Sequence, residues 1–148
     1  WLMGDLAQAG SAWPPLVVLA AALVLAMPFA RELNLLARGL LQAQAMGVAV
    51  GRLRYVIYLL ASLATAASVT TAGSIGFIGL VVPHLVRLAT GNDQRLLLPA
   101  SALAGGALLM LADTLARSLI APQQLPVGVL TALIGVPVFL FLLSRQAK

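Results

Sequence analysis

Long apolar runs separated by short polar ones make up most of the chain. A membrane-spanning helix needs roughly 20 apolar residues, or slightly fewer where the bilayer adapts. The third run is short and contains Pro83, so we expect a half-length or broken helix there, and we expect the last run to break near Gly135 and Pro137. The pattern predicts an all-α membrane protein with about five transmembrane helices, at residues 14–30, 55–73, 75–90, 96–118 and 126–144.

The composition favours a bilayer over water as the main solvent. Of 148 residues, 61% are apolar and 9% are charged, and the mean hydropathy is +1.04. Soluble domains are about half apolar and a quarter charged. The net charge of +5 is spread thinly along the chain. It forms no dense basic stripe with interleaved aromatic residues, so we expect no nucleic-acid partner.

The residue types exclude several kinds of site. Lys148 is the only lysine, which rules out a phosphate-binding loop that needs Lys after a Gly-rich turn. The chain has no cysteine and a single histidine, which argues against a zinc site or a disulfide framework. We predict no metal site, no directly bound cofactor and no catalytic residue. Because the chain begins at Trp1 rather than Met, we interpret it as a piece of a longer protein.

The basic residues fall unequally on the two sides that five crossings create. Arg117 lies on one side, and the other side carries Arg31, Arg38, Arg52, Arg54, Arg87, Arg95, Arg145 and Lys148. Loops rich in Lys and Arg stay in the cytoplasm. The segment 31–54 and the tail 145–148 are therefore predicted to be cytoplasmic. The asymmetry would weaken if residues 75–90 did not cross.

The segment 31–54 is half polar. Its apolar positions Leu33, Leu36, Leu40 and Ala43 follow helical spacing, and Gly39 and Gly47 interrupt the run. This predicts one or two short amphipathic helices at the cytoplasmic face. Such a segment either rests on lipid headgroups or docks on a cytoplasmic partner, and the spacing alone does not decide between the two.

Two glycine-containing stretches favour structural roles. The series Gly73, Gly76 and Gly79 lacks the order of a nucleotide-binding loop, so we expect close helix packing and a bend. In the stretch 91–95 (GNDQR), Gly91 can end one helix in the left-handed conformation. Asn92 or Asp93 can then cap the next helix, which predicts a tight turn with no further chemistry.

Four ionisable side chains lie near or within the predicted spans. His84 and Arg87 share a helix face, and we expect a structural hydrogen bond for His84. Asp113 and Arg117 are spaced i, i+4, which predicts an ion pair within one helix. Arg117 also lies where a partner outside the membrane could reach it.

The order of motifs resembles the FecCD family, the permease subunits of bacterial ABC importers for iron-siderophore, haem and vitamin B12. The matching stretches are LNLLARG…MGV (33–48), GSIGFIGLVVPHLVRL (73–88), GNDQRLLLPASALAGGALLMLADTLAR (91–117) and QLPVGVLTALIGVPVFLFLL (124–143), and WLMGDL (1–6) is similar to the family's opening segment. Such permeases are about twice as long with roughly ten spans. The resemblance therefore implies that residues 1–148 are the C-terminal half of one.

The resemblance also implies partners and roles. It implies ABC ATPase subunits that hold ATP, a periplasmic or lipoprotein substrate-binding protein, a second permease copy and a place in the inner membrane. Arg117 matches the arginine that pairs with an acidic residue of the binding protein. The coupling element that docks on the ATPase matches Leu33, Leu36, Ala37, Arg38, Gly39, Leu40, Gln42, Ala43 and Gly47. Structural motif positions match Pro83, His84, Arg87, Asp93, Arg95, Asp113, Pro126, Gly128, Gly135 and Pro137.

Three departures from the family pattern change the expected contacts. Leu40 and Leu41 follow Gly39 where the family commonly has glutamate, and glutamine stands at positions 94 and 124. We expect a coupling surface built on shape and apolar packing. The alternatives are a non-transporting membrane anchor or assembly module, a secondary transporter, which the resemblance disfavours, and an intramembrane enzyme. The sequence argues against an enzyme because His84 and Asp113, the plausible acid-base groups, are expected near opposite faces.

Overall fold

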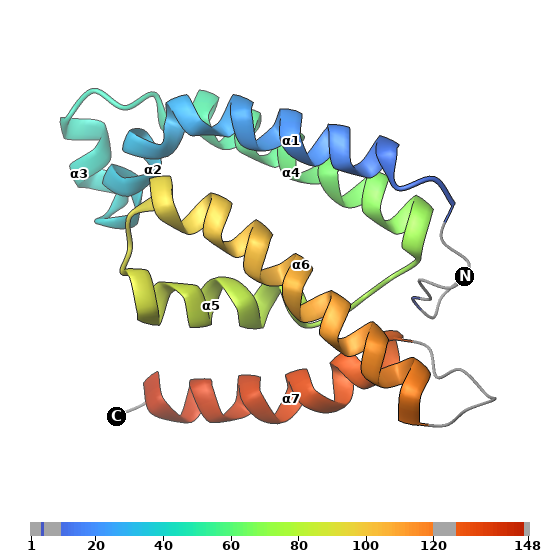
Figure 1. Cartoon of the computed structure of the whole chain (residues 1–148). Coiled ribbons are helices and arrows are strands. Elements are labelled where there is room, and N and C mark those ends of the chain that lie inside the picture. Colours follow the sequence, from blue (N-terminus) through green and yellow to red (C-terminus); the bar gives the residue numbers. More distant parts are fainter. Residues whose placement is uncertain (1–3, 5–9, 120–126, 147–148) are drawn as a thin grey trace.

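A computed structural model describes Gly4 and residues 10–119 and 127–146 of the chain (Figure 1). The described residues form helices and connecting turns, without a strand. The elements are α1 (Trp13–Ala26), the 3-10 turn η1 (Met27–Phe29), α2 (Ala30–Ala37), α3 (Leu40–Ala45), α4 (Val50–Ala72), α5 (Ile78–Thr90), α6 (Gln94–Leu119) and α7 (Val127–Gln146). The predicted all-α class is confirmed.

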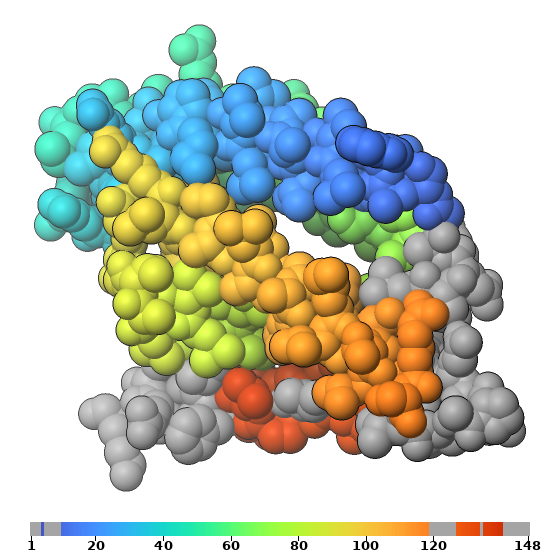
Figure 2. All heavy atoms as spheres, viewed as in Figure 1, coloured from blue at the N-terminus to red at the C-terminus, as the bar shows by residue number. Residues whose placement is uncertain are grey.

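The helices form two groups. In Figure 1, α1 and α4 lie side by side, and α5, α6 and α7 pack on one another. The main helix-to-helix contact between the groups is that of α2 with α6. Towards the other end of the molecule an open gap separates α1 from the second half of α6 (Figure 2). The short helix α2 therefore lies where the two groups meet.

The two ends of the molecule differ in charge. One end contains α2 and α3, the turn between α5 and α6, and the C-terminal end of α7 (Figure 1). We call it the arginine-rich end, because it carries Arg31, Arg38, Arg52, Arg54, Arg87 and Arg95. The opposite end, which we call the Arg117 end, contains the connection from α4 to α5 and the last turn of α6. The long helices α1, α4 and α6 run between these two ends, α1 towards the arginine-rich end and α4 and α6 away from it (Figure 1).

Many large apolar side chains of the described residues are exposed. Three helical stretches are long and apolar enough to cross a membrane, Trp13–Ala37, Val50–Ala72 and Gln94–Ser118, and two shorter apolar helices accompany them, Ile78–Thr90 and Val127–Leu140. Large apolar side chains on them remain open, such as Leu25 at 56% exposure and Leu103 at 77%. Helices that satisfy their own backbone groups while exposing apolar side chains suit a lipid environment.

The observed helices differ from the predicted spans at four places. Helical backbone continues beyond residue 30, through the 3-10 turn at Pro28, to Ala37. The second long helix begins at Val50 rather than near residue 55. The third helix begins only at Ile78, after the non-helical residues 73–77. The last helix is not interrupted near Pro137. Proline removes one backbone donor from a helix, which can bend it without ending it.

The bend expected at the glycine series is confirmed, because residues 73–77 are non-helical between α4 and α5, whereas the expected close packing is not found for Gly76 or Gly79 among the described residues. A Cβ atom at Gly76 or Gly79 would meet nothing within 4 Å. Gly73 instead ends α4 with a φ of 71°, a conformation that favours glycine. Close packing occurs on α7, where a Cβ at Gly135 would lie 2.9 Å from Cγ of Phe77. Phe77 itself has a positive φ of 66° at the start of α5.

Candidate functional site

Glycine residues divide the 31–54 segment into separate helices. α2 ends before Gly39, whose φ is 136°, and α3 is followed by Gly47, whose φ is 82°. The amide of Gly47 donates to the carbonyl of Gln44 (3.0 Å), and the amide of Val48 donates to that of Ala43 (3.0 Å). These bonds close the end of α3. Two short helices therefore stand between α1 and α4, within the range that the sequence predicted.

The apolar residues of this segment do not form one continuous face. Ala43 is buried and Leu33 and Leu36 are half-buried. Leu40, which the spacing placed with them, is exposed, because the chain turns at Gly39 and the helical period is not carried from α2 into α3. The outer surface of α3 and the turn after it presents Leu40 (44% exposed), Leu41 (80%) and Met46 (66%).

The polar side chains of the same segment separate into two sets. Ala37 is exposed beside the outer apolar residues, and so are the polar side chains of Arg38, Gln42 and Gln44. Asn34 is half-buried and faces the start of α6. Its Nδ2 group donates to Oδ1 of Asp93 (2.8 Å), and its Oδ1 accepts from the amide of Gln94 (2.8 Å). This contact across 59 residues was missed from the sequence, where the turn at Asp93 was expected to carry no further chemistry.

Asp93 caps α6 as predicted. Its Oδ1 accepts a hydrogen bond from the amide of Arg95 (3.0 Å), and Gly91 ends α5 with a φ of 81°. The hydrogen bond from Asn34 and then the one from Arg95 hold the pKa of the Asp93 carboxyl below its ordinary value of 3.8. The exposed carboxylate is therefore ionised at neutral pH. With Asn34 it satisfies two of the amides that a helix leaves without partners at its start, those of Gln94 and Arg95.

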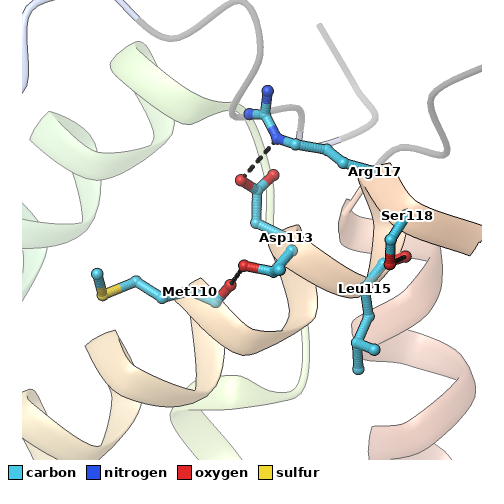
Figure 3. Close-up of polar contacts among 6 residues, drawn as sticks. Met110, Asp113, Leu115, Arg117 and Ser118 are labelled. Carbon is cyan, nitrogen blue, oxygen red and sulfur yellow. Dashed lines mark hydrogen bonds and ion pairs between the residues drawn. The ribbon is translucent and has the colours of Figure 1, made fainter.

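The opposite end of α6 carries an ion pair. Nε of Arg117 lies 2.8 Å from Oδ2 of Asp113, one turn earlier in the same helix, so the predicted pair is confirmed (Figure 3). Neighbouring hydroxyls bond back to their own helix, Thr114 to the carbonyl of Met110 and Ser118 to that of Leu115. Arg117 is 43% exposed, and its bond to Asp113 uses Nε, while its Nη groups make no hydrogen bond with the described residues.

The remaining predicted positions lie on several helices. Pro83 and His84 are half-buried within α5, and the hydrogen bond expected of His84 is not found among the described residues. Arg87 and Arg95 are exposed at the arginine-rich end. Gly135 is buried against Phe77. Pro126 lies outside the described residues.

A cavity of about 610 Å³ adjoins the start of α7. The amide of Gly128 donates to the carbonyl of Gly4 (3.2 Å), and the amide of Gly4 donates to the carbonyl of Ser74 (3.1 Å). None of the lining residues is charged: Gly4, Ser74, Gly128, Val129, Ala132, Leu133, Val136 and Pro137. Among the described residues no three His, Cys, Asp or Glu side chains are placed to hold a metal ion.

Comparison with known proteins identifies the family. The profile of the FecCD transport family matches residues 1–145. The chain belongs to this family. It is 50% identical to the cobalamin import system permease protein BtuC of Halobacterium salinarum, over 99% of this chain and 40% of that protein. It is 47% identical to the hemin transport system permease protein HmuU of Yersinia pestis, over all of this chain and 45% of that protein.

A solved structure has the same fold. It is a metal-chelate type ABC transporter in an inward-facing conformation, with a TM-score of 0.85 and 36% sequence identity to this FecCD-family chain. The match covers 98% of this chain and 47% of the solved one. The chain therefore spans somewhat less than half the length of the relatives that it matches.

Proposed function

We propose that this chain is the C-terminal half of a permease subunit in an ATP-driven importer that carries a metal chelate into the cytoplasm. The observation that carries the proposal is the pair of short helices, α2 and α3, held between two long apolar helices and exposing Leu41 and Met46. The names of the relatives support chelates of the haem, cobalamin or iron-citrate type as cargo.

We assign residues 31–54 as the coupling segment that docks on an ABC ATPase subunit, where ATP is bound. Leu41 offers a large apolar side chain in place of the acid common in the family, and Arg38, Gln42 and Gln44 lie exposed around it. An exposed apolar centre with a polar rim is the usual composition of a protein interface. Both ends of the segment continue into long helices, so a displacement of the docked segment would tilt α1 and α4.

The Arg117 end is assigned to the outer side of the bacterial inner membrane, with the arginine-rich end in the cytoplasm. There the Nη groups of Arg117, which make no hydrogen bond with the described part of the chain, can meet an acidic residue of a periplasmic or lipoprotein substrate-binding protein. The exposed apolar faces of the long helices are assigned to lipid, to the other half of the permease and to a second permease copy. No cofactor is assigned to this chain.

Cysteine cross-linking in the assembled, full-length transporter tests the docking claim. Cysteine at Gln42 or Gln44 is expected to cross-link to the ATPase subunit, because both side chains are exposed beside Leu41. Cysteine at Thr114, exposed at the opposite end, is the matched control and should give no cross-link to that subunit. If no position between residues 36 and 47 cross-links while the ATPase is present, the segment does not dock, and a non-transporting anchor becomes the better interpretation.

A further inference from the structure

Asn34 joins the two helical groups of the chain. It belongs to α2, which continues from α1, and both polar atoms of its side chain bond to residues at the start of α6, in the α5–α6–α7 group. Asp93 accepts its amide hydrogen at 2.8 Å, and the amide of Gln94 donates to its oxygen at 2.8 Å. We call Asn34, Asp93 and the amide of Gln94 the Asn34 clamp.

We propose that the Asn34 clamp transmits the displacement of the coupling segment to α6, so that the segment and α6 move as one body during transport. The inference rests on the proposed function, since it needs an ATPase that displaces the segment. Covalent connections already tie the segment to α1 and α4. The clamp supplies the connection to the other group, at the place where α2 packs on α6.

The chemistry of the clamp requires an amide. The side chain at position 34 donates to a carboxylate and accepts from a backbone N–H at the same time. Asparagine provides one donor group and one acceptor on adjacent atoms. Alanine would leave both partners without their bond, and aspartate would keep the acceptor but place a second carboxylate against Asp93. The fit is therefore specific to asparagine rather than to any polar residue.

The length of α6 would allow the clamp to act over a long distance. α6 is a single helix of 26 residues, which corresponds to about 39 Å at 1.5 Å per residue. It begins at the clamp and ends just beyond Arg117. Because the gap between α1 and the second half of α6 leaves that half free of α1 (Figure 2), a movement at the clamp is carried along α6 towards the Arg117 end.

The test uses the full-length transporter with its ATPase subunits, reconstituted in lipid vesicles and supplied with cobalamin or haemin as the transported probe. Asn34→Ala removes both clamp bonds. Asn92→Ala is the matched control, because Asn92 is exposed in the adjacent turn and its side chain makes no hydrogen bond with the described residues. Asp93→Asn keeps an Oδ1 acceptor and should behave as wild type. The measured quantities are ATPase-subunit retention, basal ATP hydrolysis and substrate transported per ATP.

We expect Asn34→Ala to retain the ATPase subunit and basal hydrolysis but to transport about fivefold less substrate per ATP, because both clamp bonds are lost. Asp93→Ala and the double variant should show the same loss, because residues that act as a unit are not additive. Unchanged transport per ATP in Asn34→Ala would overturn the proposal, and so would loss of the ATPase subunit, which would mean that Asn34 only shapes the docking surface. A wild-type complex that binds no ATPase subunit would instead overturn the proposed function.

Discussion

At its first residues, α6 is bonded to a side chain that lies 59 positions earlier in the chain. Among the described residues, the side-chain hydrogen bonds of its last turn stay within α6 itself. Asn34 and Asp93 join two helical groups, while Asp113 and Arg117 are one turn apart on the same helix. The difference indicates different tasks for the two ends. Both ends of α6 pack on other helices, α2 at the arginine-rich end and α7 at the Arg117 end, where Ala112 lies in a buried cluster with Val127 and Leu130. The Arg117 end in addition presents a partly exposed cation to another molecule.

The largest effect is expected from Asn34→Asp, which places two carboxylates together at the arginine-rich end. Repulsion between the introduced carboxylate and that of Asp93 raises the pKa of each of them above the lowered pKa that Asp93 has in the native chain. We expect the melting temperature of the detergent-solubilised permease at neutral pH to fall by about 2–4 °C, the shift produced by losing one hydrogen bond in a chain of this size.

The stability lost in Asn34→Asp should return as the pH falls, because protonation of one carboxyl removes the repulsion and restores a donor. Thermal unfolding of the variant at several pH values checks this. Asn92→Asp adds the same charge one residue before Asp93, at a side chain that makes no hydrogen bond with the described residues. The melting temperature of this variant should therefore stay close to that of wild type. Equal losses in the two variants would show that the added charge, rather than the broken clamp, is responsible.

A smaller effect is expected from Arg117→Glu at the Arg117 end. Charge reversal replaces attraction by repulsion across an exposed pair, which should weaken binding-protein docking by about tenfold at low ionic strength. The loss should shrink as salt is added, because salt screens exposed charges. Surface plasmon resonance with the isolated binding protein measures this, and Arg87→Glu, at the arginine-rich end, is the control. An affinity that does not change at low salt would remove the docking role.

The smallest effect is expected from Asp113→Asn. An exposed i, i+4 ion pair contributes about 0.5 kcal/mol or less, so the free energy of unfolding should hardly change. Chemical denaturation of the permease in detergent checks this. If Asp113→Asn destabilised the permease as much as Asn34→Asp does, the hydrogen bonds at the two ends of α6 would contribute equally to stability, and the comparison would fail.

The sequence predicts contacts between residues that are close along the chain and misses contacts between distant ones. The Asp113–Arg117 pair, the cap at Asp93 and the chain reversals at Gly39, Gly47 and Gly91 depend on neighbours within a few residues, so spacing alone indicates them. The hydrogen bond between Asn34 and Asp93 depends on how α2 packs against α6, and the spacing of residues within one helix does not predict this packing.

Two further features escaped prediction for related reasons. Leu40 was placed on the wrong face because the turn at Gly39 breaks the helical period that the spacing assumed. The close approach of Gly135 to Phe77 depends on a positive φ at a phenylalanine, a conformation that its sequence does not favour. Both arise where the backbone leaves its regular geometry.

The most direct test of the account is the distance between the coupling segment and the far end of α6 in the working transporter. Nitroxide labels on cysteines at Gln44 and Thr114, both exposed, can be followed by pulsed electron paramagnetic resonance with and without nucleotide. If the Asn34 clamp joins the coupling segment to α6, the distance distribution between the two labels should not change in wild type when nucleotide binds. In Asn34→Ala the same distribution should shift when nucleotide binds. A wild-type distance that changes on nucleotide binding as much as it does in Asn34→Ala would contradict the account.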